Sequence, residues 1–332
     1  MKDNGVKMFE SYEKGIKYID ELIDFLGSRD IYAESRSHVE DDYLLSYEYF
    51  ENYTKNPSTL QDDRGRSAFI GLYELYNWIW SVKDCVEFEK LSEHLKLLVQ
   101  CSPNINSYTS MYLDPKVTVK TEKRVQDDKS NKFVEAILGM FAVKIGTNVD
   151  LDDPMKSSGG ENPDIIFDFR GNRISFACKT PRGESIETLI ANFKSAAEQI
   201  ERADCDYGFI VINAMNITNH KQINTVFDDP NVPLDIIVRD VDSKYYQIAK
   251  TSEIEEDDVD KIDEVKNIFT GKKTRLAVVT LIHSATRIRS VHGNLLTSLK
   301  TMNVSNFDTE NDLPENDLIL LNLLNEFIHG RL

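Results

Sequence analysis

Side chains suited to phosphate chemistry lie at the ends of two predicted strands in the middle of the chain. The segment ENPDIIFDFRGNRISFACKTPRGES places Asp164 at the start of one strand and Lys179 at the end of the next. The turn signal at residues 170–173 lies between them, so we expect a hairpin that brings the two residues together. Carboxylate oxygens bind hard divalent cations, and a lysine stabilises charge on a phosphate. The pair is suited to metal-dependent cleavage of phosphodiester bonds.

Two predicted helices flank this hairpin and add an acid and an amide. The apolar spacing of residues 132–145 predicts a helix from which Glu135 faces outward. Residues 185–203 form a second amphipathic helix, which carries Gln199. A near-continuous apolar run at 207–214 follows, as expected for a strand covered on both faces. The order helix, strand, turn, strand, helix, strand predicts an α/β core with a mixed central sheet flanked by helices.

The rest of the chain divides into a helical part and further α/β elements. The first hundred residues predict helices, and the polar residues 54–66 predict a loop. Residues 101–130 change in composition, and we place the domain boundary there, with an all-α domain at 1–113 and the α/β domain at 114–332. In the second domain, the remaining predicted elements are strands at 234–239, 245–249 and 276–283 and a C-terminal helix at 316–328. The acidic residues 253–264 predict an exposed loop.

Composition restricts the class of protein. The chain has 332 residues, with 56 acidic against 39 basic side chains, and a formal net charge of −17. This charge opposes the coating of DNA and binding to an anionic membrane. No apolar run is long enough to span a bilayer, and the N-terminus lacks the apolar core of a signal peptide, so we expect a cytoplasmic protein without membrane contact. The four cysteines form no CxxC motif, which favours incidental thiols in a reducing compartment.

One stretch runs against the overall acidity. Between Phe169 and Gly183 there are four basic residues and no acid. Arg170, Arg173 and Arg182 are therefore candidates for binding a nucleic-acid backbone beside Lys179.

Together, these features resemble the PD-(D/E)XK nuclease superfamily, which has the restriction-endonuclease-like fold. The resemblance covers residues 132–214, about a quarter of the chain. It implies that Asp164 is a metal ligand for Mg²⁺ or Mn²⁺ and that Lys179 is the catalytic lysine. It also implies that Glu135 is an accessory acid and that Gln199 lies near the phosphate.

One position departs from the family pattern. The family has Asp or Glu two residues before the lysine, whereas this chain has Ala177. Three explanations stay open: a Glu→Ala substitution made to inactivate the enzyme, natural divergence in which the acid has moved to the following helix, and loss of activity. For the second explanation the candidate acids are Glu184, Glu187 and Glu198, of which Glu198 is favoured because it adjoins Gln199.

The resemblance implies a DNA endonuclease. A helical module fused to such a nuclease is typical of prokaryotic anti-phage defence or repair effectors, by analogy of fold. The expected partners are DNA, a second copy in a homodimer or higher homo-oligomer, and a protein of the same defence system. The alternatives are a catalytically inactive nucleic-acid-binding or regulatory protein with the same fold, a protein-interaction scaffold, and an α/β domain in which Asp164 merely caps a turn.

Overall fold

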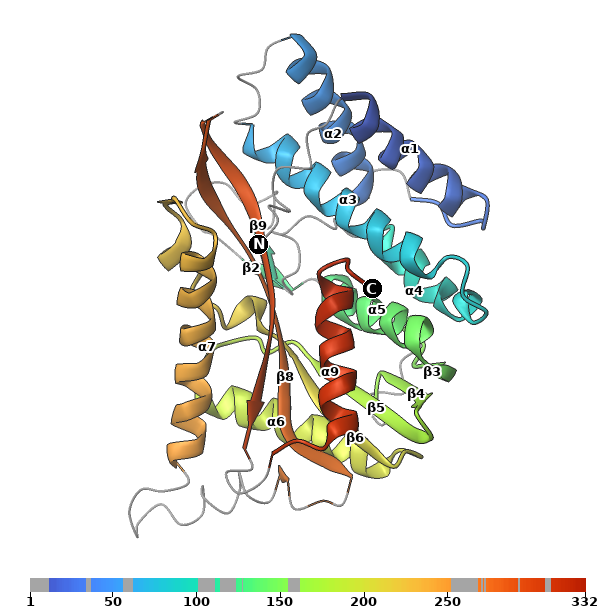
Figure 1. Cartoon of the computed structure of the whole chain (residues 1–332), viewed down its shortest axis with the longest axis vertical. Coiled ribbons are helices and arrows are strands. Elements are labelled where there is room, and N and C mark those ends of the chain that lie inside the picture. The colour runs from blue at the N-terminus through green and yellow to red at the C-terminus, as the bar shows by residue number, and fades with distance from the viewer. Residues whose placement is uncertain are drawn as a thin grey trace.

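The chain folds as a mixed α/β structure with a helical region at its N-terminus (Figure 1). The computed structural model describes residues 12–33, 37–55, 62–100, 111–113, 124–126, 128–154, 162–251, 268–269, 271, 273–291, 293–307 and 312–332. The predicted acidic loop at 253–264 lies outside these residues.

The described part of the N-terminal region consists of helices. They are α1 (Tyr12–Gly27), α2 (His38–Lys55), α3 (Asp63–Val82), the short 3-10 helix η3 (Phe88–Leu91) and α4 (Ser92–Leu98). Asp62 caps α3 by accepting a hydrogen bond from the backbone N–H of Arg64. The predicted helical character is confirmed. The predicted loop at 54–66 is too long, because α2 extends to residue 55 and α3 begins at residue 63.

A seven-stranded mixed sheet forms the centre of the molecule. Its strands are β3 (Thr147–Leu151), β4 (Ile165–Phe169), β5 (Asn172–Lys179), β6 (Tyr207–Asn213), β7 (Val226–Phe227), β8 (Thr274–Ser290) and β9 (Gly293–Asn306). The order is β3-β4-β5-β6-β8-β7, and β9 pairs with β8. The β3–β4, β4–β5 and β8–β9 pairs are antiparallel, whereas β6 runs parallel to β5 and β8. A separate two-stranded sheet contains β1 (Met111–Leu113) and β2 (Arg124–Gln126).

Among the residues that the structure describes, four α-helices accompany the α/β part of the chain. They are α5 (Asp128–Ile145), α6 (Ile186–Arg202), α7 (Asn231–Thr251) and α9 (Glu315–Ile328). Helix α6 makes the crossover between the parallel strands β5 and β6, and the Ser185 side chain caps it by accepting from the N–H of Thr188 at 3.2 Å. Among the helices that the structure describes, none has the length and apolar character needed to cross a membrane.

The two faces of the sheet contribute to two hydrophobic clusters. Successive side chains of β5 and β6 point to opposite faces of the sheet and therefore belong to different clusters. Phe176 and Phe209 lie in the cluster with α5, whereas Ala177 and Ile210 lie in the cluster with α6 and α7. The residues that precede the candidate site are therefore fixed by packing on both faces.

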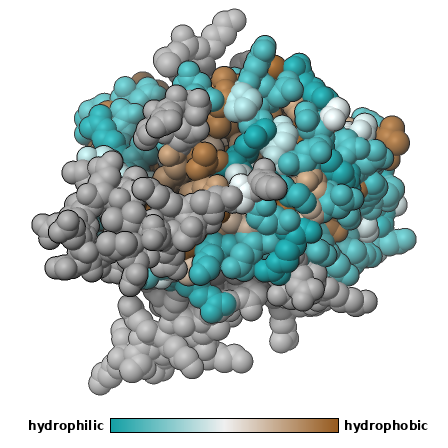
Figure 2. Space-filling model, turned by 90° about the horizontal axis from the view of Figure 1, so that it is seen from below, coloured by the Kyte–Doolittle hydropathy of each residue, from teal (hydrophilic) through white to brown (hydrophobic). Residues whose placement is uncertain are grey.

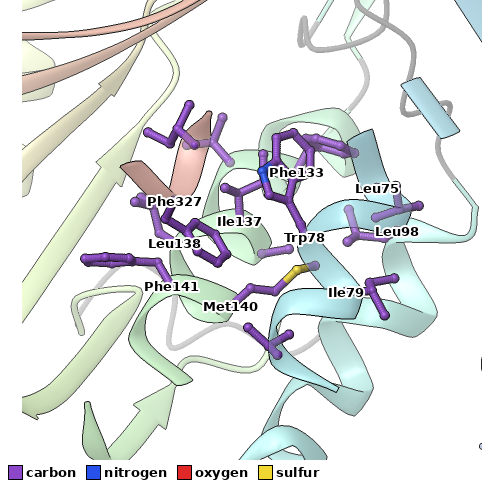
Figure 3. Close-up of a cluster of buried hydrophobic side chains, with 14 of the residues drawn as sticks. Leu75, Trp78, Ile79, Leu98, Phe133, Ile137, Leu138, Met140, Phe141 and Phe327 are labelled. Carbon is purple, nitrogen blue, oxygen red and sulfur yellow. The ribbon is translucent and has the colours of Figure 1, made fainter. Parts of the chain in front are cut away.

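The N-terminal helices share the first of these clusters with the α/β part. Trp78 of α3 packs edge-on against Phe133 of α5, with ring centroids 6.0 Å apart. Phe141 of α5 lies 5.7 Å from Phe327 of α9. Figure 3 shows these side chains filling the space between α3, α5 and α9. One continuous core thus joins the predicted helical domain to the α/β domain.

Several predicted elements are confirmed and one pair is wrong. Helices α5, α6 and α9 and strands β4, β5 and β6 lie where the sequence predicts them. Strand β8 contains the strand predicted at 276–283 but extends to residue 290, where it pairs with β9. The strands predicted at 234–239 and 245–249 are instead parts of the single helix α7. Its buried residues Ile237, Val241, Tyr245 and Ile248 recur every three or four positions, and this helical stripe outweighs the local β-branched content.

One face of the molecule is largely polar in the part that the structure describes (Figure 2). Seen from below, the described part of the surface in Figure 2 is mostly hydrophilic, with a small group of hydrophobic residues near its centre. One cavity of about 320 Å³ lies in the helical region, lined by residues that include Leu26, Ile31 and Tyr43. Its lining contains none of the predicted site residues.

Candidate active site

Asp164 lies at the end of the sheet, one residue before β4. Its carboxylate Oδ2 accepts a hydrogen bond from the backbone N–H of Cys178 at 2.6 Å. Because Ile165 pairs with Phe176 in the antiparallel ladder, the same register places Asp164 opposite Ala177. The hairpin therefore brings Asp164 to the end of β5, as the sequence predicts.

Helix α5 brings a second carboxylate and a lysine to Asp164. Glu135 is buried, so the prediction that it faces outward is wrong, because this face of α5 packs against the end of the sheet. Its Oε2 accepts a hydrogen bond from Lys132 Nζ at 2.7 Å. The same Nζ lies 4.0 Å from Asp164 Oδ1. The i, i+3 spacing places Lys132 and Glu135 on one face of the helix, and that face meets the sheet end. Lys132 was not among the predicted site residues, although its i, i+3 spacing from the predicted acid Glu135 could have indicated it.

The two carboxylates lie in an environment that disfavours negative charge. Burial, followed by the charge of Asp164, raises the pKa of Glu135 to about 8, although Lys132 and Lys179 oppose the shift. Burial also raises the pKa of Asp164 against the opposing effects of the Cys178 N–H and the two lysines. Burial lowers the pKa of Lys132, but the charge and hydrogen bond of Glu135 outweigh it, so the net shift is upward. A cation near two such buried acids would favour their charged, carboxylate forms.

Lys179 and Gln199 meet on the α6 side of the sheet. Lys179 Nζ donates to Gln199 Oε1 at 2.5 Å, and Gln199 Nε2 donates to the Asn162 carbonyl at 2.8 Å. Gln199 is only 2 % exposed, so its amide is held in place and in turn orients the lysine ammonium. The structure thus brings together Glu135, Asp164, Lys179 and Gln199, which the sequence analysis selected. Their catalytic roles remain predictions.

Ala177 and Cys178 point to opposite faces of β5. Ala177 is fully buried in the hydrophobic cluster beneath α6, on the same face as Lys179. Cys178 lies in the other cluster, as the alternation predicts. Burial, and then the charges of Asp164 and Glu135, raise the pKa of the Cys178 thiol well above its ordinary value. This thiol therefore lies beside the carboxylates in its protonated form, which disfavours a role as a nucleophile.

The acids predicted on the segment after β5 are directed elsewhere. Glu198 is exposed and pairs with Arg202 at 3.1 Å, one turn along α6. Glu184 pairs with Lys244 at 3.4 Å, and Glu187 is exposed. No contact of Glu198 with Asp164 is found among the described residues. The second carboxylate beside Asp164 is instead Glu135, which comes from the helix before the hairpin.

The basic segment does not form the single patch that the sequence suggests. Arg170 and Arg173 lie at the hairpin turn, and Lys179 lies at the other end of β5, about 20 Å from Arg173 by strand rise. Arg173 is also neutralised, because its Nη1 contacts Asp168 Oδ1 at 2.8 Å. Arg182 is exposed and follows Lys179 at the Asp164 end of the strand. The antiparallel hairpin separates residues that are close in sequence.

The chemistry of the Asp164 and Glu135 side chains limits which metal ion they could hold. Within the residues that the structure describes, no group of three or more His, Cys, Asp or Glu side chains could hold a metal ion. Asp164 and Glu135 supply two carboxylates, and Mg²⁺ commonly binds through one or two carboxylates while it keeps several waters. The pair fits a hydrated Mg²⁺ or Mn²⁺, and it does not fit an all-protein cage such as a structural zinc site.

Comparison of the chain with protein-family models, with curated proteins and with solved structures found no match. Function is therefore inferred from the site itself.

Proposed function

We propose that the chain is a metal-dependent nuclease that cleaves DNA phosphodiester bonds at the end of β5. The observation that supports this most is the meeting of two buried carboxylates, Glu135 and Asp164, at the sheet end where Lys179 also lies. The element order around them agrees with the restriction-endonuclease-like arrangement that the PD-(D/E)XK resemblance implies.

Each residue has a distinct role in this proposal. Asp164 and Glu135 would hold Mg²⁺ or Mn²⁺, which when bound would polarise the phosphate and lower the pKa of a coordinated water. Lys179 stabilises the negative charge that develops on the scissile phosphate. Gln199 is a positioning residue, because its amide accepts from the Lys179 ammonium and is itself fixed by the Asn162 carbonyl. Preorganised charge of this kind acts strongly where water is largely excluded.

The acidity of the chain limits how DNA can bind. With a net charge of −17, attraction must come from local cations, of which Lys132, Lys179 and Arg182 lie at this end of the sheet. So few phosphate contacts predict weak binding that weakens further as salt increases. Fusion to a helical region fits a prokaryotic defence effector, and expression of the active chain should then reduce phage plaques.

A second candidate function is a catalytically inactive nucleic-acid-binding or regulatory protein with the same fold. Ala177 is the observation that favours it, because alanine supplies no metal ligand at the position where the family has an acid. Such a protein would bind DNA through Lys179 and Arg182 and leave it intact.

A plasmid-nicking assay separates the two candidates. The native chain should nick supercoiled DNA in Mg²⁺ or Mn²⁺ and lose this activity in EDTA. Asp164→Asn should reduce the rate about 100-fold or more, by loss of a metal ligand. Asp168→Asn, on the same strand but paired with Arg173, is the matched control and should cut like the native chain.

The Ala177→Glu chain completes the test. Activity that appears only in Ala177→Glu would indicate that an acid is missing from the native sequence. If neither chain cuts double-stranded DNA, single-stranded DNA or RNA, the nuclease proposal is wrong. DNA binding without cleavage, lost in Lys179→Ala, would support the second candidate.

A further inference from the structure

We infer that Lys132 is an internal counter-cation that occupies the cation position between Glu135 and Asp164, so that a divalent metal binds there only after the ammonium moves away. This inference rests on the proposed metal site and adds to it a resting state and a residue that controls metal affinity.

The geometry places the ammonium between the two acids. Lys132 Nζ lies 2.7 Å from Glu135 Oε2 and 4.0 Å from Asp164 Oδ1. A divalent ion held by both carboxylates would have to lie near the same point, because its bonds to oxygen are only about 2.0–2.2 Å long. One ammonium and one metal ion cannot occupy that space together.

The charge balance explains why a cation is needed there. The side chains of Glu135 and Asp164 are 9 % and 10 % exposed, so a negative charge on either carboxyl group is poorly solvated. Among the described residues, Lys179 is a second lysine close to them, but its ammonium donates to Gln199. Lys132 therefore supplies the positive charge that keeps the two acids together in the absence of a metal.

Lys132 also has somewhere to move. Its side chain is 22 % exposed, and it ends in a compact ammonium on a flexible four-carbon stem. The Lys132 charge also acts on His94 of α4, which is buried, and burial followed by this charge lowers the pKa of His94 to about 4. This neutral imidazole does not repel the ammonium as a cation would. A phosphate group of bound DNA would attract Lys132 outward and leave both carboxylates to the metal.

Mn²⁺ binding, measured by electron paramagnetic resonance without DNA, tests the inference. We expect Lys132→Met, which keeps the length of the side chain and removes its charge, to bind Mn²⁺ at least roughly tenfold more tightly than the native chain. Lys144→Met is the matched control, because this lysine is on the same helix and donates to the Ser81 carbonyl. It should bind Mn²⁺ like the native chain. The double variant Lys132→Met/Asp164→Asn should lose the gain, which locates the ion.

A second measurement covers the case in which Lys132→Met is poorly folded. Removal of the internal cation should lower its thermal unfolding midpoint in EDTA, and Mn²⁺ should restore the midpoint more in this variant than in the native chain or Lys144→Met. Equal Mn²⁺ affinity in Lys132→Met and the native chain, or no stabilisation by Mn²⁺, would overturn the inference.

The outcomes also separate this inference from the nuclease proposal. If Lys132→Met binds Mn²⁺ more tightly but no variant cuts DNA, the inference about Lys132 is supported and the nuclease proposal is wrong. If the native chain cuts DNA but Lys132→Met gains no affinity, only the counter-cation is wrong.

Discussion

Glu135→Gln should change how the stability of the protein depends on pH. Burial raises the pKa of Glu135 to about 8 in the folded chain, whereas the ordinary pKa of this carboxyl group is 4.5. Between these values the folded state binds more protons than the unfolded state. Glu135 therefore contributes fully to the free energy of unfolding below about pH 4.5. This contribution decreases as the pH rises toward 8 and is absent above that pH.

The size of this effect follows from the difference in pKa. One pKa unit corresponds to about 1.4 kcal/mol. The difference between the folded and the ordinary pKa of Glu135 therefore corresponds to an upper limit of several kcal/mol in the free energy of unfolding. Lys132 shares the interaction and reduces the observed part. Glutamine keeps the shape of the side chain and cannot ionise. The free energy of unfolding of Glu135→Gln should therefore rise relative to the native value from pH 5 to pH 8, by about 1–4 kcal/mol.

Urea unfolding in EDTA at a series of pH values, followed by tryptophan fluorescence, measures this difference. Trp78 is buried at the junction between α3 and α5 and reports on the shared core. Glu198→Gln is the control, because Glu198 is exposed, and its curve should run parallel to that of the native chain. A native and a Glu135→Gln curve that stay parallel from pH 5 to pH 8 would refute the reasoning.

Substitutions of Gln199, Ala177, Arg182 and Trp78 test the site, the DNA contacts and the shared core. Gln199→Leu should reduce nicking about 10–100-fold by releasing its lysine partner, and should cost about 1–3 kcal/mol in urea unfolding because the Asn162 carbonyl loses its donor. Ala177→Glu should unfold at lower urea than the native chain in EDTA, because it buries a carboxylate in an apolar cluster, and Mg²⁺ should reduce the difference. Arg182→Ala should lower the slope of DNA affinity against salt by about 1, whereas Arg173→Ala should leave it unchanged. Trp78→Ala should cost about 3–5 kcal/mol in a single calorimetric transition, because one core joins the two regions.

The sequence was most informative where one local pattern determines the structure. The apolar stripe of α6 and its Ser185 cap could be recognised directly, as could the apolar run of β6. The meeting of Asp164 and Lys179 followed from a hairpin with a short turn, because antiparallel register is local. The stripe predicted the helix that carries Gln199, whereas its place at the site was implied by the resemblance to the PD-(D/E)XK superfamily.

Features that depend on tertiary packing could not be predicted in this way. The sequence pattern does not distinguish Lys132 from other lysines on helices. Lys132 reaches Asp164 only because α5 packs against the end of β4 and β5. Arg170 and Arg173 are near Lys179 in the sequence but are carried to the far end of the hairpin. Short segments of α7 are rich in β-branched residues and therefore match the pattern of a strand. The packing of α7 against α6 and β8 stabilises the helix instead.

Metal-dependent nicking of plasmid DNA by the native chain and by Asp164→Asn tests the central claim most directly. The account predicts nicked product with Mg²⁺ or Mn²⁺, none with EDTA, and about 100-fold less with Asp164→Asn, while Asp168→Asn matches the native rate. DNA left intact by both the native and the Ala177→Glu chains, or cleavage equally fast with Asp164→Asn, would contradict it.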